Sequence, residues 1–228
     1  IWYIDGSGNA VSVPNGRYVP VTGTVTFSTT HFSQYAVAYR PVYFNDVAKN
    51  AWYHNAVSFI AARDITRGTG NDRYSPEATL TRGEFIVLLM RACDIKADEN
   101  PTDNFSDAGS NYYTGYLAAA KRVGISAGVG NNMFAPEKTI TRQEMFTLLC
   151  NALREIKQLP EMKNSNEVGR SKSLSDFTDE GQIASWAREA MTLLVETGII
   201  NGNAGKLTPT EITTRAQMAQ VLYNLMTR

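Results

Sequence analysis

The sequence predicts a mainly α-helical protein made of three helix-loop-helix repeats, which a short β segment precedes. Two observations support this class. A Thr-Arg pair followed by an apolar stripe at helical spacing occurs three times, at Arg82, Arg142 and Arg215. An aromatic residue followed 13 positions later by an isoleucine, with apolar residues or alanines between them, also occurs three times. Because one helix pair cannot cover its own apolar faces, we expect three pairs to pack about a common axis.

The first 41 residues differ in character from the rest of the chain. The stretch VTGTVTF alternates polar and apolar residues, while DGSGN and PNG are turn sequences. We therefore interpret residues 1–41 as the β-hairpin-like end of a preceding domain. Since Ile1 already lies within an expected strand, we also expect the chain to be a fragment of a longer protein.

Each repeat begins with a Phe-x-Asp signal and ends with the helix that follows Thr-Arg. The three aspartates are Asp46, Asp107 and Asp179, and they precede their arginines by 36, 35 and 36 residues. The expected repeats are 42–101, 102–173 (including a polar linker) and 174–228. In the linker, Arg154 to Ser173, we expect an extended helix end followed by an exposed loop.

The Thr-Arg motif predicts where the last helix of each repeat starts. Three pairs fit the capping box, a contact worth about 1 kcal/mol: Thr81 with Glu84, Thr141 with Glu144, and Thr214 with Gln217. The arginine does not fit this explanation, because a cation at the first helical position opposes the positive end of the helix dipole. Its occurrence there in all three copies predicts a negative group opposite it.

Two kinds of anion are consistent with this placement. One is internal: Asp46, Asp107 or Asp179 pairs with an arginine and joins neighbouring repeats, which is worth about 0–1 kcal/mol if the pair is exposed. The other is a ligand carboxylate or phosphate, held by the guanidinium fork and by free N–H groups of the helix end.

Aromatic residues and turn glycines near each aspartate favour a sugar-binding groove, which needs a flat apolar face and directional polar groups. The candidates are Trp52, Tyr53, Tyr112, Tyr113, Trp186, Gly68, Gly128 and Gly202. Taken singly, each has a structural explanation, since the tryptophans can fill a core and the glycines can supply positive φ.

Composition and spacing argue against several other classes. The 22 basic and 22 acidic residues cancel, which argues against nucleic-acid binding. The longest apolar run, Phe85 to Met90, is too short to insert into a membrane. His31 and His54 belong to no zinc-binding spacing, and the glycine-rich loops lack a P-loop lysine. We expect no metal, no cofactor, no catalytic residues and no enzymatic activity.

The two cysteines, Cys93 and Cys150, both lie in apolar helical patterns. They stand at different offsets from the arginines of their repeats. We therefore expect two small core residues rather than a disulfide or a metal pair.

The recurring motifs closely resemble those of the S-layer homology family. Five motifs recur in order from about Val42 to Arg228: Phe-x-Asp, an aromatic residue, Gly-Ile-x-x-Gly, aromatic-x-Pro and Ile-Thr-Arg-x-Glu. The resemblance implies a pseudo-threefold helical bundle that anchors a surface protein to secondary cell-wall polysaccharide. It places the protein outside the cell, on the surface of a Gram-positive bacterium. It implies no oligomeric state.

By the same resemblance, grooves between repeats hold a pyruvylated amino sugar. The arginines Arg82, Arg142 and Arg215 would meet the carboxylate of the pyruvate ketal. The Phe-x-Asp carboxylates would accept hydrogen bonds from sugar hydroxyls, and the turns around Gly68, Gly128 and Gly202 would add backbone contacts.

The chain also departs from the family pattern. Gly83 and Gln143 replace the usual alanine after Thr-Arg, Gln217 replaces a glutamate, Asp64 replaces the glycine before Ile65, and Leu207 replaces an aromatic residue. We expect Gln143 to narrow the second groove, and we expect unequal sites with the third least suited to bind. The alternative function is a structural or protein-binding repeat module without glycan binding. Arginines pointing into open grooves would favour glycan binding, whereas arginines buried in ion pairs would favour the alternative.

Overall fold

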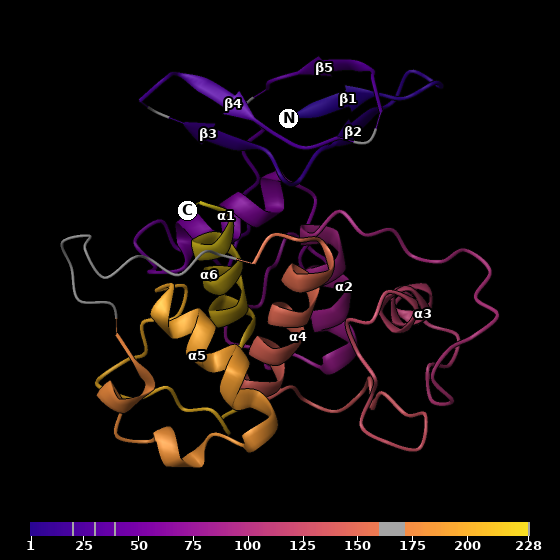
Figure 1. Ribbon diagram of the computed structural model, residues 1–228. Coiled ribbons are helices and arrows are strands. Elements are labelled where there is room, and N and C mark those ends of the chain that lie inside the picture. Colours follow the sequence, from indigo (N-terminus) through magenta and orange to yellow (C-terminus); the bar gives the residue numbers. More distant parts are fainter. Residues whose placement is uncertain (20, 30, 39, 160–171, 228) are drawn as a thin grey trace. The chain divides into compact units, whose positions relative to one another are not determined.

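A computed structural model describes the chain except for residues 20, 30, 39, 160–171 and 228 (Figure 1). Of the described residues, 34% are helical and 12% lie in strands or bridges. The class is therefore mixed α and β, and the prediction of a mainly α, pseudo-threefold helical bundle is wrong. The reason is that the first segment forms two sheets and that the segments before the arginines pair with one another through β-bridges.

The described part contains six α-helices, which are α1 (His54–Ala62), α2 (Arg82–Ala92), α3 (Thr114–Arg122), α4 (Arg142–Glu155), α5 (Arg188–Glu196) and α6 (Arg215–Met226). Three short 3-10 helices are η1 (Leu174–Asp176), η2 (Glu180–Gln182) and η3 (Ser185–Ala187). Two helices were expected in each repeat, and these elements confirm them. Beyond the end of α4, residues 160–171 of the predicted linker loop lie outside the described residues.

Five strands occupy the start of the chain: β1 (Trp2–Ile4), β2 (Ala10–Ser12), β3 (Arg17–Val19), β4 (Thr24–Thr26) and β5 (Gln34–Ala36). They form an antiparallel three-stranded sheet in the order β2-β1-β5 and a separate β3-β4 hairpin. The turn between β1 and β2 is set by Asp5, whose carboxylate accepts from the backbone N–H groups of Ser7 (2.9 Å) and Asn9 (2.8 Å).

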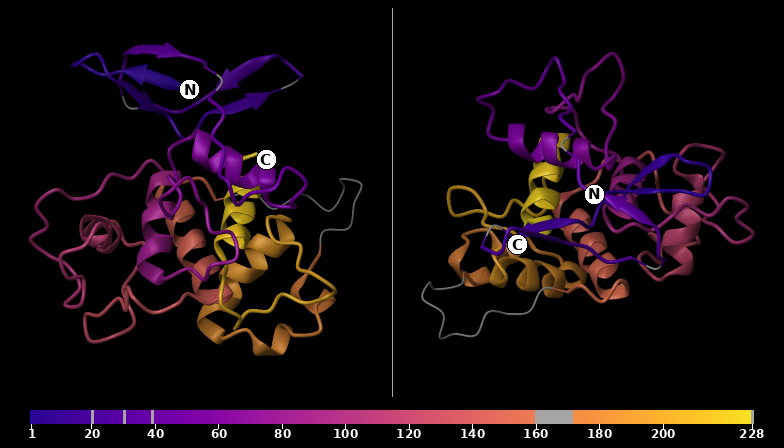
Figure 2. Two further views of the ribbon diagram at one scale, coloured as in Figure 1. Left: turned by 180° about the vertical axis from the view of Figure 1, so that it is seen from behind. Right: turned by 90° about the horizontal axis from the view of Figure 1, so that it is seen from above.

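The chain divides into two compact units. Unit 1 comprises residues 1–78, 91–95 and 215–228, and unit 2 comprises residues 79–90 and 96–214. In unit 1, α1 and α6 lie side by side in both views of Figure 2, and the Phe59 and Tyr223 rings meet edge to face at 5.1 Å. In unit 2, α4 packs against α5 and η3. These units cut across the expected repeats, whose limits stay a prediction.

A closed ring of backbone hydrogen bonds lies within unit 2. The Leu80 N–H donates to the carbonyl of Thr213 (3.0 Å), Thr213 to Ile140 (3.0 Å), and Ile140 back to Leu80 (2.9 Å). All three residues are fully buried. Since each precedes one Thr-Arg motif by one position, the three motif segments meet at this point.

The expected helix caps are present at α2 and α4. Thr141 accepts from the backbone N–H of Glu144, and the Glu144 carboxylate accepts from the Thr141 N–H at 2.8 Å. Thr81 and Glu84 make the same reciprocal pair. Cys93 and Cys150 are both free, and burial raises the pKa of the Cys93 thiol to about 12. No helix in the described ranges has the length and apolarity that a membrane span requires.

Candidate functional site

The three arginines share one backbone anchor. In each case Nε donates to the carbonyl of the first residue in the aromatic-x-Pro motif of another repeat. The bonds join Arg82 to Phe134 (2.9 Å), Arg142 to Leu207 (2.8 Å) and Arg215 to Tyr74 (2.8 Å). The Nε bond fixes the direction of each guanidinium and leaves the Nη groups for other partners.

The three aspartates clamp the same aromatic-x-Pro segments. Each carboxylate accepts from two successive backbone N–H groups: Asp46 from Tyr74 and Ser75, Asp107 from Phe134 and Ala135, and Asp179 from Leu207 and Thr208, at 2.7–2.9 Å for the shortest bond to each donor. Burial alone would raise the pKa of Asp46 and Asp179, but the N–H groups outweigh it and both pKa values are lowered. The predicted bonds to sugar hydroxyls would therefore have to use the remaining lone pairs of these carboxylates.

The first N–H groups of α2 and α4 are already bonded to backbone carbonyls. Arg82 and Gly83 donate to Lys138 (2.9 Å) and Pro136 (2.8 Å), and Arg142 and Gln143 donate to Glu211 and Pro209 (both 2.9 Å). An anion at either helix start would thus meet the guanidinium but not the free N–H groups that we expected.

The negative group opposite Arg82 is Glu144, whose sequence motif indicates only a helix cap. Nη1 of Arg82 lies 3.1 Å from Oε1 of Glu144, and the two side chains are 5% and 15% exposed. Burial lowers the pKa of Arg82, which Glu144 partly offsets. Burial alone would raise the pKa of Glu144, but bonds from Thr141 and the positive charges of Arg82 and Lys138 lower it. None of the three expected aspartates makes this contact.

Arg142 has a different environment from Arg82. It is half-buried, and within the described part of the chain no carboxylate lies at ion-pair distance from it. Its guanidinium lies 5.2 Å from the Phe146 ring, whereas Arg82 stacks on Phe134 at 4.6 Å. The difference follows from Leu207, which offers Arg142 no ring at the position of Phe134. Arginines buried in ion pairs were expected to favour a structural module rather than glycan binding. Arg82 is in such a pair and Arg142 is not, so the two arginines favour different functions.

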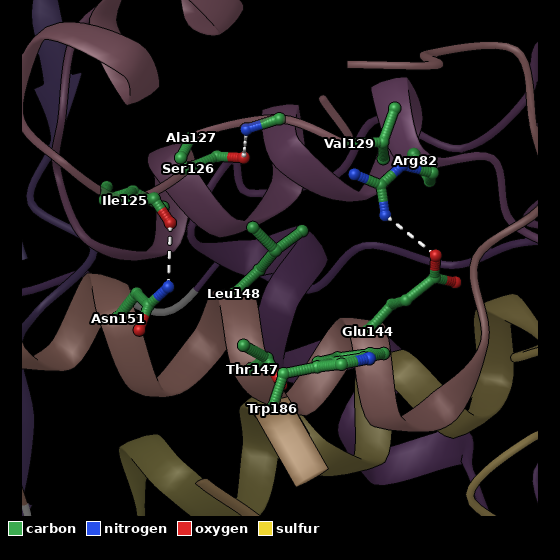
Figure 3. Close-up of a pocket in the computed structure, with 11 residues that line it drawn as sticks. Arg82, Ile125, Ser126, Ala127, Val129, Glu144, Thr147, Leu148, Asn151 and Trp186 are labelled. Atoms are coloured by element: carbon green, nitrogen blue, oxygen red, sulfur yellow. Dashed lines mark hydrogen bonds and ion pairs between the residues drawn. The ribbon is translucent and has the colours of Figure 1, made fainter. Parts of the chain in front are cut away.

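A groove of about 480 Å³ in unit 2 combines predicted site residues from all three repeats (Figure 3). Arg82, Gly128 and Trp186 line it together with Glu144 and residues of α4. In Figure 3 the Trp186 ring lies across one side of the groove, and Arg82 and Glu144 point toward each other. The groove thus has an aromatic face, a polar turn and a charged pair, which suits a sugar ring.

Exposure separates the predicted aromatic residues into two groups. Trp52, Tyr112 and Trp186 are 61%, 62% and 55% exposed, so the explanation that the tryptophans fill a core is wrong. Tyr53 is half-buried, and Tyr113 is buried with its hydroxyl donating to Glu137. The first three remain candidates for stacking on sugar rings, while Tyr113 has a structural contact.

The three predicted glycines are required by close packing. Gly68, Gly128 and Gly202 have φ of +78°, +83° and +64°. A Cβ at Gly128 would collide with the Met133 carbonyl and with the Phe105 ring. These glycines let the turn pass close to neighbouring backbone, and the turn at Gly128 borders the groove.

Sequence reasoning missed a polar stripe on α4. Gln143, Thr147 and Asn151 recur at spacing four, and Thr147 and Asn151 line the groove. Asn151 donates to the Ile125 carbonyl at 3.0 Å. Gln143, which we expected to narrow a groove, accepts from the Ala184 N–H at 3.0 Å and so holds the segment that carries Trp186. Comparing the polar face of α4 with its apolar stripe would have revealed these residues.

No cluster of three potential metal-binding side chains occurs among the residues whose placement is described. A further cavity, of about 650 Å³, lies in unit 1 between Trp2, Arg40 and Asp64 and contains none of the predicted site residues.

Comparisons with known proteins agree with the repeated motifs. The S-layer homology domain matches residues 43–86, 104–146 and 176–219, together more than half of the chain. An amylopullulanase of Thermoanaerobacterium thermosulfurigenes is 33% identical over 99% of the chain, and exoglucanase XynX of Acetivibrio thermocellus is 33% identical over 82%. The S-layer protein sap of Bacillus anthracis is 25% identical over 89%. The chain spans only 12%, 16% and 23% of the lengths of these relatives.

Proposed function

This chain belongs to the S-layer homology domain family, and we propose that it holds a surface protein on the wall by binding pyruvylated secondary cell-wall polysaccharide. Domains of this family anchor surface proteins to the cell wall, and the relatives include S-layer proteins and surface enzymes. We infer a Gram-positive wall as the site of attachment. The three predicted repeats, 42–101, 102–173 and 174–228, would together form the anchoring module.

The observation that carries this proposal is the groove lined by Arg82, Gly128 and Trp186, one residue from each repeat. A half-exposed tryptophan offers a face on which a pyranose ring can stack. Asn151, Ser126 and Thr147, which also line the groove, supply amide and hydroxyl groups. The groove residues thus combine the apolar face and the directional polar groups that sugar binding needs.

Arg142 is the best candidate for the carboxylate of a pyruvate ketal. Its Nε is fixed by the Leu207 carbonyl, and its guanidinium has no carboxylate at ion-pair distance in the described ranges. The planar fork can bind a carboxylate through two hydrogen bonds. Burial lowers the pKa of Arg142, and Glu211 and Asp179 partly offset this, so the charge is retained at neutral pH.

We infer that the chain itself is not catalytic. In the relatives that are named as enzymes, the matching region is a small part of the protein, 12% of the amylopullulanase and 16% of the exoglucanase. Catalysis in those proteins can therefore reside elsewhere, and this region would contribute attachment.

A second function, a structural repeat module without glycan binding, is favoured by the Arg82–Glu144 ion pair and by the aspartate clamps. Both contacts stabilise the chain without any ligand. The alternative predicts that polysaccharide does not bind at all, which distinguishes it from the anchoring function.

Calorimetric titration with purified wall polysaccharide, before and after chemical removal of the ketals, tests the proposal. We expect binding that is lost with the ketals. Arg142→Ala should weaken it by about 2–5 kcal/mol, because a desolvated charge would lose its partner. Arg142→Lys should restore it only in part, since lysine lacks the planar fork.

Arg154→Ala is the matched control, because Arg154 lies at the other end of the same helix in an exposed pair with Glu189. It should bind as tightly as the wild type. Wild-type affinity in the Arg142 variants would contradict the role of Arg142, and absence of binding to either polymer would favour the structural module.

A further inference from the structure

We propose that the cavity of about 650 Å³ in unit 1 binds a carboxylate that carries a small apolar group, as the free C-terminus of a short apolar peptide does. The carboxylate would bind to Arg67, and the apolar group would pack on the sheet beside Trp2. This site lies outside the groove of unit 2, and the inference does not rest on the proposed glycan binding.

The apolar wall of the cavity is one face of the three-stranded sheet. Trp2 and Ile4 are two positions apart on β1, so their side chains share this face. Ala36 of β5 lies opposite Trp2 in the pairing register, and both line the cavity. Ala10 of β2 lies opposite Ile4, and both line it too. Because the outer strands carry only methyl groups beside the large side chains of the central strand, the face leaves room for an apolar group of a ligand.

The turn after α1 brings two charged residues of the first repeat to the same cavity. Asp64 and Arg67 both line it. When the repeats are aligned on Ile65 and its equivalents, the other two repeats carry uncharged residues at these positions, namely Gly124 with Ala127 and Gly198 with Asn201. The charges are therefore particular to the first repeat and are not needed to form the turn.

The backbone at Asp64 shows that this charge is kept at a cost. Asp64 has φ of +56°, and the equivalent Gly124 and Gly198 have φ of +83° and +70°. Glycine adopts this left-handed conformation freely, whereas aspartate is strained in it. A charged residue at a position that favours glycine points to a role for its side chain rather than for the local backbone.

The ion pair in the cavity leaves one cation free. Nη1 of Arg40 lies 2.9 Å from Oδ2 of Asp64, and its guanidinium lies 5.0 Å from the centre of the Trp2 ring. Arg40 therefore neutralises Asp64. Arg67 is exposed and makes no hydrogen bond or ion pair with any residue that the structure describes. Its planar guanidinium can bind a carboxylate through two hydrogen bonds.

The lining favours an apolar carboxylate over an acidic sugar. Apart from the indole N–H of Trp2, the described residues around the cavity offer no neutral polar side chain. Ser12 shares the sheet face with Trp2, but its hydroxyl donates to the Arg63 carbonyl at 3.0 Å. Sugar hydroxyls would thus lose water and find few partners, whereas a methyl group would gain from burial against the alanines.

The test follows the indole N–H signal of Trp2 by NMR, assigned with Trp2→Phe, in the 228-residue chain. The ligands are N-acetyl-dialanine with a free carboxylate, the same peptide with a C-terminal amide, and glucuronate, which carries its carboxylate on a polar ring. We expect the peptide acid to bind at least about tenfold more tightly than the amide, because a hydrogen-bonded charge pair is lost in the amide. It should also bind more tightly than glucuronate.

Arg67→Ala should weaken binding of the peptide acid about tenfold for the same reason. The variant should fold, because the second repeat carries Ala127 at this position. Arg17→Ala is the matched control, since Arg17 is an exposed arginine of the same unit that does not line the cavity. It removes the same charge and should bind the peptide as the wild type does.

Equal affinity for the acid and the amide would overturn the inference, as would equal behaviour of the Arg67 and Arg17 variants. Tighter binding of glucuronate than of the peptide would contradict the peptide as the occupant. A Trp2 signal that none of the ligands shifts would exclude the site altogether. The comparison of acid and amide in the wild type decides the question even if Arg67→Ala fails to fold.

Discussion

At the residue scale, neighbours rather than position in the repeat decide what each motif residue does. Arg82 and Arg142 each follow a threonine and each begin the second helix of a repeat. In both, Nε donates a hydrogen bond to a backbone carbonyl. Yet Glu144 neutralises Arg82, and the equivalent residue in the third repeat is the uncharged Gln217. Two copies of one motif are thus chemically unequal, since Arg82 is in a buried ion pair and Arg142 has no carboxylate at ion-pair distance within the described ranges.

The buried side chain of Thr213 gives a prediction at the scale of a single residue. It is fully buried in the backbone ring, where Leu80 and Ile140 hold the equivalent positions. Its hydroxyl is, within the described ranges, the one buried side-chain polar atom that has no hydrogen-bond partner. We expect Thr213→Val to raise the free energy of unfolding by about 1 kcal/mol, since an unsatisfied hydroxyl is removed at nearly constant volume. Urea denaturation at neutral pH measures this change.

Thr66→Val is the control for that prediction. Thr66 is also buried, but its hydroxyl accepts from the Gly68 N–H at 3.2 Å. Its replacement should lower stability because a bonded donor would lose its partner. If both variants lost stability alike, the Thr213 hydroxyl would have to be bonded in solution.

At the element scale, the loops between the two helices of each repeat are held from both ends. A glycine with positive φ lets each loop pack against the phenylalanine of Phe-x-Asp, and the aspartate binds the two N–H groups of aromatic-x-Pro. The same loops bury large apolar side chains such as Tyr74 and Phe134, so the hydrogen bonds fix the backbone that carries these core residues. The recurrent Phe, Asp and Gly of the family motif therefore serve this architecture.

Gly128→Ala tests the close packing of this loop. Its φ is +83°, and the added methyl group would collide with the Met133 carbonyl and the Phe105 ring. Gly130→Ala is the matched control in the same loop, with φ of +104° but no heavy atom within 4 Å of the new Cβ. We expect a loss of about 1–2 kcal/mol at Gly130 from backbone strain and a larger loss at Gly128. If thermal or urea unfolding showed the same loss of stability in both variants, backbone strain rather than close packing would explain the effect.

Asp179→Asn tests the aspartate clamp and its pH dependence. The pKa of Asp179 is lower in the folded state than in the unfolded state, where it is about 4. The stabilisation that the ionised carboxylate gives the fold is therefore fully present above the unfolded pKa, and it is lost as the pH falls through the folded pKa. Asparagine keeps one acceptor and turns a donor toward the backbone N–H groups, which should cost about 1–3 kcal/mol at pH 7. The stability difference from the wild type should shrink toward pH 2.

The control for the clamp is Asp103→Asn, which breaks an exposed pair with Lys121. It should change stability little at either pH. An Asp179→Asn deficit that stays constant between pH 7 and pH 2 would contradict the role of the ionised carboxylate.

At the scale of the whole molecule, the sequence predicted the elements better than their assembly. Helical periodicity and capping boxes predicted the helices, because both signals are local. The β-bridges between Thr79 and Thr214, Thr81 and Thr139, and Thr141 and Ile212 join residues far apart in the chain, so no local pattern reveals them. That is why the predicted class was too helical.

The same limit applies to the site. Arg82, Gly128 and Trp186 were predicted singly, and the structure brings them to one groove. The pairing of Arg82 with Glu144 spans 62 positions and depends on the fold, so the capping role of Glu144 was the only one that the sequence could indicate. The roles of all the predicted site residues in sugar binding stay predictions.

Binding to a repeating polymer gives the last prediction. If grooves of the module act together, a long polysaccharide should bind more tightly than a single repeating unit of the same polymer, because after the first contact the next becomes intramolecular. We expect the polymer to bind about 100-fold more tightly. Calorimetry with size-fractionated polymer, at concentrations expressed per repeating unit, measures the difference. Arg142→Ala should abolish most of this enhancement. Equal affinity for long and short ligands would mean that one groove does all the binding, and anchoring strength would then depend on the number of modules rather than on the grooves of each.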